Sequence, residues 1–294
     1  MTLDQLRVFV AVAERQHMTR AAEALNIVQS AASAAVAALE AGHGVRLFHR
    51  VGRGIVLTEA GRLFLVEARA VLARASAAEV ALAELGGLVR GVLSVQASQT
   101  IASYWLPRHL VAFRRAYPGI EIRLGIGNTA QVAAAVHEGL AELGFVEGVV
   151  EDGHLLSQVV AADRLVLVVA PDHPWAMSPG LGLHEMAEGG EWVLRERGSG
   201  TRSAFEGALA AAGVAPGTLR VALELPSNEA VRAAVEAGLG ATVISASVAV
   251  SGLEAGLLHR VPVNLPERDF HVLRHRERPP SRAAEALLAL IGRR

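Results

Sequence analysis

The sequence predicts a small helical unit that carries a β-hairpin, then one long helix, then an α/β domain. Three observations support this order. Residues 1–58 hold three short amphipathic segments, followed by two apolar runs that flank a Gly-Arg-Gly turn. Residues 59–90 keep an apolar repeat of four and three residues, which is the spacing of one long helix. Beyond Gly91, short apolar runs alternate with helical patterns, which is typical of an α/β fold.

The composition narrows the classes of protein to consider. A chain of 294 residues suggests two domains at roughly 150 residues each. Cysteine is absent, which excludes disulfides and Cys-ligated metal sites. Asp4 stands where a signal peptide would be basic, and no apolar run reaches the ~18 residues of a membrane span, so we expect a cytoplasmic protein without a membrane partner.

Two helices that meet at a tight turn are predicted between Thr19 and Glu40, after a first helix from about Leu3 to Gln16. Thr19 is the expected N-cap of a helix Arg20–Leu25. The next helix starts near Gln29–Ser30 and buries an apolar stripe. Its other face presents Gln29, Ser30 and Ser33, which suit the base-reading face of a helix-turn-helix unit. An Ala-rich hairpin in any helical protein shares this pattern, so the hairpin alone leaves both interpretations open.

The next residues favour DNA binding. Val45–Arg50 and Ile55–Thr58 flank Gly52-Arg53-Gly54 and predict a β-hairpin wing. Arg53 is then placed to reach phosphates or a minor groove, and Arg20 and Arg50 to reach phosphates. Residues 1–61 carry six arginines against five acidic residues and no lysine, so affinity would depend on well-placed arginines rather than on bulk charge.

Several runs resemble the LysR-type transcriptional regulators. They are RAAEALNIVQSAASAAVAALE, GVRLFHR, LTEAG, YWLPRHLVAFRRAYPGIEI, IGNTAQVAAAV, ELGFVEG, WVLRERGSGTR and EAGLGATVIS, which together span most of the chain. Val28, where the family has a polar N-cap, and Met18, where it has an aromatic residue, depart from the pattern.

The resemblance implies three parts. These are an N-terminal all-α winged helix-turn-helix (1–61), a linker helix that pairs with its copy (59–90), and a two-lobed α/β effector domain like the periplasmic binding proteins (91–294). Lobe I would hold about 91–162 and 267–294, and lobe II about 163–266. The implied partners are double-stranded DNA, a small-molecule effector, a second or further copies in a dimer or tetramer, and RNA polymerase.

An effector site is expected where polar turns follow the predicted parallel strands. Open parallel sheets bind ligands beyond the carboxyl ends of their strands, where helix N-termini offer free N–H groups. Taken alone, each such turn is also an ordinary helix N-cap. The resemblance places Ser98, Thr100, Thr129 and Thr201 in the effector cleft, and the run WVLRERGSGTR resembles members that sense small anions such as sulfur oxyanions. The full set of candidate effector residues is Ser98, Gln99, Thr100, Asn128, Thr129, Glu147, Ser199, Thr201, Arg202 and Asn228, with Arg202 as the cationic partner of an anion.

Two other functions compete with this interpretation. Gly125–Ala130 follows a predicted strand and has Glu147 about 20 residues on, which matches a dinucleotide fingerprint and would indicate an NAD-dependent oxidoreductase. A stand-alone small-molecule binding protein is the other alternative. Ser199 lacks the Gly-x-Ser-x-Gly spacing of a nucleophile elbow, and His271 and His275, four apart on a predicted strand, are separated by roughly 13 Å. We therefore expect no catalytic residues, no cofactor and no metal ligands.

Overall fold

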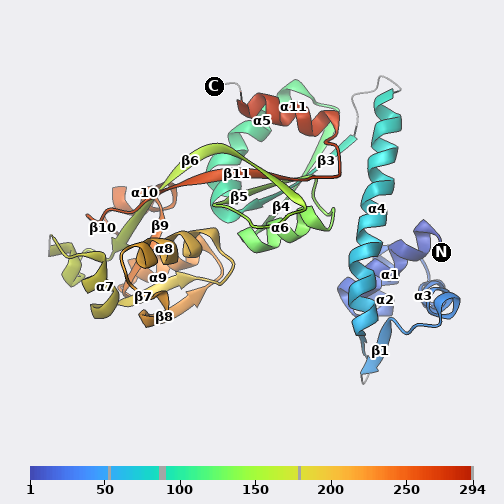
Figure 1. Ribbon diagram of the computed structural model, residues 1–294, viewed down its shortest axis with the longest axis horizontal. Coiled ribbons are helices and arrows are strands. Elements are labelled where there is room, and N and C mark those ends of the chain that lie inside the picture. Colours follow the sequence, from blue (N-terminus) through green and yellow to red (C-terminus); the bar gives the residue numbers. More distant parts are fainter. Residues whose placement is uncertain (52–53, 86–90, 178–179, 293–294) are drawn as a thin grey trace. The chain divides into compact units, whose positions relative to one another are not determined.

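The computed structural model describes residues 1–51, 54–85, 91–177 and 180–292. The chain divides into two compact units (Figure 1). One contains Met1–Leu88 with the turn Glu138–Leu140, and the other contains Val89–His137 and Ala141–Arg294. Within the described residues no single helix is both long and apolar enough to cross a membrane, and only α2 and α3 taken together, bent by 108° at their break, have that length and composition.

The first unit begins with three helices, α1 (Leu3–Arg15), α2 (Met18–Ala24) and α3 (Gln29–His43). Gln16 takes a left-handed conformation (φ 49°) and ends α1. The predicted N-cap Thr19 is wrong, because α2 starts two residues earlier than predicted and the ring of its N-cap, His17, accepts from the backbone N–H of Arg20. As predicted, α3 buries Ala32, Val36 and Leu39.

The hairpin and the long helix also form. Strands β1 (Phe48–Val51) and β2 (Gly54–Leu57) pair antiparallel, and α4 runs from Glu59 to Leu85. Leu65, Ala68 and Leu72 of α4 pack on the core of the three small helices, whereas Leu63 and Val66 are exposed. Part of the apolar surface of this helix is therefore used within its own chain.

The second unit is built on one nine-stranded sheet with the order β4-β3-β5-β11-β6-β9-β7-β8, to which β10 adds beside β6. Strands β3, β4 and β5 of lobe I are parallel, and so are β7, β8 and β9 of lobe II. The bounds are β3 Gly91–Ser98, β4 Ile120–Gly127, β5 Leu143–Glu147, β6 Leu155–Val169, β7 Glu191–Arg195, β8 Arg220–Leu225, β9 Ala241–Ser245, β10 His259–Val261 and β11 Glu267–His275.

Two long strands connect the lobes. The first part of β6 pairs with β11 in lobe I, and its second part, Leu165–Val169, pairs with β9 and β10 in lobe II. Figure 1 shows β6 and β11 running together between the lobes. The sheet is mixed rather than largely parallel, because both of these strands run antiparallel to their neighbours.

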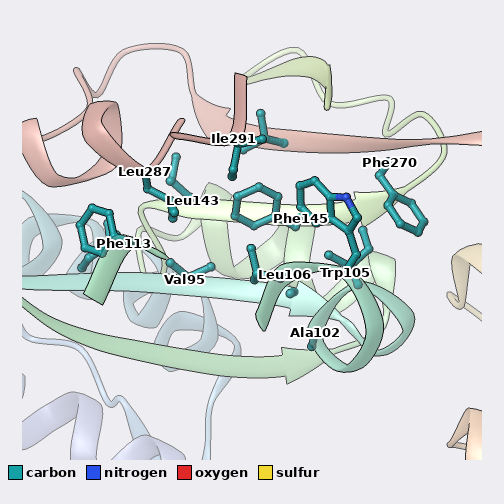
Figure 2. Packing of buried hydrophobic residues seen from close by; sticks show 14 of the residues in the cluster. Val95, Ala102, Trp105, Leu106, Phe113, Leu143, Phe145, Phe270, Leu287 and Ile291 are labelled. Atoms are coloured by element: carbon teal, nitrogen blue, oxygen red, sulfur yellow. The ribbon is translucent and has the colours of Figure 1, made fainter. Parts of the chain in front are cut away.

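Helices cover both faces of the sheet in each lobe. In lobe I, α5 (Leu106–Ala116) and α11 (Arg282–Gly292) lie on one face, where Phe113 of α5 belongs to the same core as Leu143 and Phe145 of β5 (Figure 2), and α6 (Thr129–His137) covers the other. A five-residue π-helix, η1 (Ile101–Trp105), leads into α5 and was not predicted. In lobe II, α7 (Leu183–Gly189) and α8 (Gly200–Ala211) cover one face, and α9 (Asn228–Glu236) and α10 (Ala246–Glu254) the other. Short 3-10 turns occupy Pro174–Met177 and Pro216–Thr218.

Candidate functional site

The exposed face of α3 carries the predicted base-reading side chains. Gln29 and Ser30 are exposed at the start of the helix, and the Gln29 Nε2 donates to Ser33 Oγ at 2.9 Å. Val28 caps the helix without a side-chain hydrogen bond, so the first N–H groups of α3 receive no side-chain cap from it. A helix start with uncapped N–H groups and short polar side chains can approach a phosphate backbone closely.

The hairpin is attached to α3 through a carboxylate. The backbone N–H groups of Leu47 and Phe48 donate to Glu40 Oε1 at 2.7 and 3.2 Å. Arg50 of β1 and Arg20 of α2 are exposed, as DNA contacts must be. Arg53 lies outside the described residues.

Four strand-end turns of the second unit bring the predicted effector residues together between the lobes. Ser98, Thr100, Glu147, Ser199, Thr201, Arg202 and Asn228 are buried. Asn228, at the start of α9, connects the lobes: its backbone N–H donates to Gln99 Oε1 at 2.7 Å and its Nδ2 to Thr100 Oγ1 at 3.1 Å. Its Oδ1 accepts from Arg195 Nη1 at 2.6 Å.

A second contact between the lobes joins α6 and β5 to the start of α8. Thr129 Oγ1 donates to Glu147 Oε2 at 3.2 Å, and Asn128 Nδ2 donates to Glu196 Oε1 at 3.2 Å. Gly200 is packed so closely that a Cβ there would lie 2.6 Å from Thr129 Oγ1 and 2.8 Å from the Glu147 carbonyl oxygen. The lobes are therefore closed on each other at this point.

Ser98 stands apart from these contacts. It lies at the end of β3, 1% exposed, and its Oγ is buried without a hydrogen-bond partner. An unpaired buried hydroxyl costs about 1–3 kcal/mol.

The structure also contains a buried ion pair, between Arg268 and Asp163, that the sequence analysis missed. Arg268 of β11 donates through Nε to Asp163 Oδ2 at 2.8 Å and through Nη1 to Thr201 Oγ1 at 3.0 Å. Its Nη2 lies 2.7 Å from Asp163 Oδ2, not aligned for a hydrogen bond, and 4.0 Å from Glu147 Oε1. Ser245 Oγ donates to the other Asp163 oxygen at 2.7 Å.

Arg202, which the sequence predicts as the cationic partner of an anion, is paired with two carboxylates in the structure. Its guanidinium donates to Glu206 Oε1 at 2.7 Å, to Glu224 Oε2 and to the Arg195 carbonyl oxygen. Burial disfavours its charge, but the hydrogen bonds to the two glutamates outweigh burial and raise the pKa of the guanidinium. Two carboxylates already compensate this arginine, because α8 places Glu206 one turn beyond it and β8 runs beside β7.

Comparison with known families decides what these two units are. Residues 3–62 match the model of the bacterial regulatory helix-turn-helix protein, lysR family, and residues 86–294 match the LysR substrate binding domain. The chain is a LysR-type transcriptional regulator.

Relatives of this LysR-type regulator span its full length. It is 37% identical over 290 residues to the uncharacterised HTH-type transcriptional regulator YeiE of Escherichia coli, covering 98% of this chain and 96% of the relative. The full-length CbnR structure complexed with its target DNA superposes with a TM-score of 0.68 at 26% identity over 99% of this chain and 97% of CbnR. The regulatory domain of CcmR from Synechocystis PCC6803, complexed with 2-PG, has a TM-score of 0.62 at 28% identity, covering 69% of this chain and 96% of that domain.

These matches identify a DNA-binding regulator with a two-lobed effector domain, and the family consists of regulators rather than enzymes. The dinucleotide interpretation of Gly125–Ala130 is therefore wrong. In the structure, Gly125 and Gly127 belong to the edge strand β4, and Asn128 and Gln131 hydrogen-bond each other's backbone at the start of α6, so the motif is a strand end with a helix cap.

Arg195, Arg268, Asp163 and Ser245 are the residues around the candidate site that sequence reasoning missed. Arg195 pairs with its neighbour Glu196 at 2.8 Å and with Asn228. Asp163 and Arg268 lie on the two connecting strands, at the boundaries predicted between the lobes. The sequence did contain a signal for this pair, because each of the two connections between the lobes carries a charged residue and the two charges are opposite. Opposite charges on neighbouring strands can form a buried ion pair.

Proposed function

We propose that the effector of this regulator is a small anion held by neutral donors between the lobes, with Ser98 as the central donor. The observation that carries the proposal is the buried Ser98 Oγ without a partner. Thr100 Oγ1 lies on the same turn and already meets Asn228 of the other lobe. The 2-PG complex of the related CcmR domain supports a small-molecule site in this kind of domain.

The charges between the lobes favour neutral donors over an arginine. Arg268 faces Asp163 and Glu147, Arg195 faces Glu196, and Arg202 faces two glutamates. Hydroxyl and backbone N–H groups at helix starts bind anions without a full positive charge. An anion at Ser98 would therefore leave the buried ion pairs intact.

The effector would act by shifting a population of cleft geometries. The closed arrangement depends on contacts of Asn228 with Gln99 and Thr100 and on the packing of Gly200. A ligand changes such an equilibrium only through different affinity for its two states. In our proposal the shift resets the spacing of the winged units on DNA through the linker helices of a dimer or tetramer, and so changes contact with RNA polymerase in the cytoplasm.

Replacing Ser98 with Ala should remove the effector response. In a thermal-shift screen against sulfite, sulfate, thiosulfate, phosphate, nitrate and carboxylates, a ligand at ~100 times its Kd adds about 2.7 kcal/mol to wild-type stability. The Ser98→Ala protein should unfold at the wild-type temperature without ligand or slightly above it, because an unpaired hydroxyl is removed, and should show no shift with that ligand.

Ser203→Ala, an exposed serine of α8, is the matched control and should keep the full shift. An unchanged shift in Ser98→Ala would refute the role of Ser98. An equal thermal shift with the neutral amides of these carboxylates would refute the proposal that the effector is an anion.

For DNA, we propose that Gln29, Ser30 and Ser33 read base edges and that Arg20, Arg50 and Arg53 contact phosphate or the minor groove. Gln29→Ala should relax base preference at one position of each half-site, where a good bidentate contact gives about 1–3 kcal/mol of discrimination. Arg50→Ala should weaken binding to all sequences and lower the salt slope by about 1. Sequencing of DNA pools selected by each variant, with anisotropy titrations at several salt concentrations, measures both effects.

Arg7→Ala is the control, because Arg7 is an exposed arginine that pairs with Asp4 at 2.8 Å on α1. It should leave both base preference and salt slope unchanged. If Gln29→Ala selects the same sequences as wild type with the same affinity, α3 does not present Gln29 to the bases.

A further inference from the structure

Val28 is the N-cap of α3, and it is 68% exposed. The apolar residues of α3 that pack on the core of this unit, Ala32, Val36 and Leu39, are at most 4% exposed. The side chain of Val28 therefore adds little to the core. Because its exposed surface is apolar, covering that surface with a partner is favourable.

Val28 does not stabilise the start of its own helix either. The two preceding helices, α1 and α2, are capped by the side chains of Thr2 and His17. Serine, threonine, aspartate and asparagine stabilise a helix at the N-cap because a side-chain oxygen accepts from a free backbone N–H. Valine has no such oxygen, and α3 begins without a side-chain cap. Val28 thus has neither a packing role nor a capping role, which points to a role on the surface.

The first turn of α3 holds this side chain in a fixed position. The carbonyl oxygen of Val28 accepts from the backbone N–H groups of Ala31 and Ala32 at 3.0 and 3.3 Å. The next side chain, Gln29, is oriented by its 2.9 Å hydrogen bond to Ser33. Valine is also stiff at χ1, so little conformational freedom is lost when a partner covers it. The helix therefore begins with an ordered apolar group beside an ordered amide.

The major groove of DNA offers one apolar group to such a side chain. Among the base edges exposed there, thymine carries a methyl group at C5. A hydroxyl at this position could donate to a phosphate, but the side chain of Val28 has no donor, so a phosphate hydrogen bond is excluded for it. Gln29 suits adenine, whose partner base is thymine. The start of α3 therefore fits a site that contains A·T pairs.

We propose that Val28 determines base specificity by covering the C5 methyl group of one thymine in each half-site. The N-terminal residues of a recognition helix are those that reach base edges in a helix-turn-helix unit. The inference rests on the proposed contact of α3 with base edges, and it adds an apolar contact to the polar contacts of Gln29, Ser30 and Ser33. Without DNA this contact is unmade, and Val28 stays exposed to water.

The test uses the full-length protein and a duplex that it selects from a random DNA pool. Each thymine of the duplex is replaced in turn by uracil, which removes the methyl group and nothing else, and anisotropy titrations give the affinities. Burial of one methyl group corresponds to about a fourfold change in affinity, so wild type should lose about fourfold at one thymine of each half-site. Val28→Ser should bind the thymine and uracil duplexes equally. Serine is a good N-cap, so this variant should fold at least as stably as wild type.

Leu63→Ser is the matched control, because Leu63 of α4 is an apolar residue that is 69% exposed. It should keep the fourfold loss with uracil. Tolerance of uracil at every position by wild type, while Gln29→Ala still relaxes base preference, would overturn the role of Val28 and leave the proposed contacts of α3 in place. A fourfold loss that persists in Val28→Ser would assign the methyl group to another residue. If wild type selects no sequence from the pool, the proposed contacts of α3 are wrong and this inference is wrong with them.

Discussion

Replacing Arg268 with Ala should destabilise the effector domain by about 3–5 kcal/mol, the cost of leaving a buried charge without its partner. Asp163 would keep only the hydroxyl of Ser245, and Glu147 would lose a guanidinium 4.0 Å away. Arg268, Asp163 and Glu147 are each less than a tenth exposed, so water cannot replace the lost charge. Thr201 would also lose its donor at the start of α8.

Tryptophan fluorescence during urea unfolding measures this effect in the right domain, because all three tryptophans, Trp105, Trp175 and Trp192, lie beyond residue 91. Arg123→Ala is the matched control, since Arg123 pairs with Glu121 at 2.8 Å while both side chains are more than half exposed. An exposed pair of this kind contributes about 0–1 kcal/mol. If Arg268→Ala unfolds at the same urea concentration as Arg123→Ala, the buried pair does not stabilise the closed domain.

The double variant Arg268→Ala with Asp163→Asn separates two explanations of a loss. Asn removes the stranded negative charge and keeps an acceptor for Ser245. Recovery of part of the lost stability in the double variant would show that the charge of Asp163 was responsible. No recovery would assign the loss to the contact of Arg268 with Thr201 and to packing.

Local patterns predicted most of the fold, because most elements show a regular apolar repeat or are bounded by glycine-containing turns. The stripe of Ala32, Val36 and Leu39 predicted α3, and the Gly-flanked turn predicted the hairpin. The start of β6 gave no such signal. Its residues Ser157–Asp163 (SQVVAAD) do not alternate between polar and apolar side chains, and their strand partner is β11, more than 100 residues away. Long-range pairing of this kind leaves little trace in a local window.

The sequence predicted which polar residues of the candidate site follow strands, but it did not predict which charged residues pair with each other there. Ser98, Thr100, Thr129 and Asn228 follow strands or open helices, so their position could be read from the order of elements. The partner of Arg202 could not, because Glu224 reaches it only through the pairing of β7 and β8.

Gly61→Ala should destabilise the helix-turn-helix unit by about 3 kcal/mol, the upper end of the usual cost of overpacking. A Cβ at this position would lie 2.1 Å from the carbonyl oxygen of Leu47 and 2.9 Å from Leu57 Cδ2. The carbonyl cannot yield easily, because it accepts from the backbone N–H of Thr58 at 3.0 Å while Leu47 itself is held by Glu40.

The other side of Gly61 is fixed as well. Its backbone N–H donates to Thr58 Oγ1 at 2.8 Å, and that hydroxyl donates to the Arg46 carbonyl oxygen at 2.8 Å. A methyl group must therefore separate the start of α4 from residues 45–47, which lead into β1, and so shift the hairpin that carries Arg50. We expect DNA affinity to fall together with stability.

Gly42→Ala makes the same chemical change where nothing lies within 4 Å of the new Cβ, near the end of α3. It should stabilise the unit by about 0.5 kcal/mol, because alanine restricts the unfolded chain more than glycine does. Amide hydrogen exchange of the buried α1 residues Leu6, Phe9 and Val12 measures both variants without interference from the effector domain. Equal protection in the two variants would mean that α4 can move away from Leu47 at little cost, and that the hairpin is not held in place by Gly61.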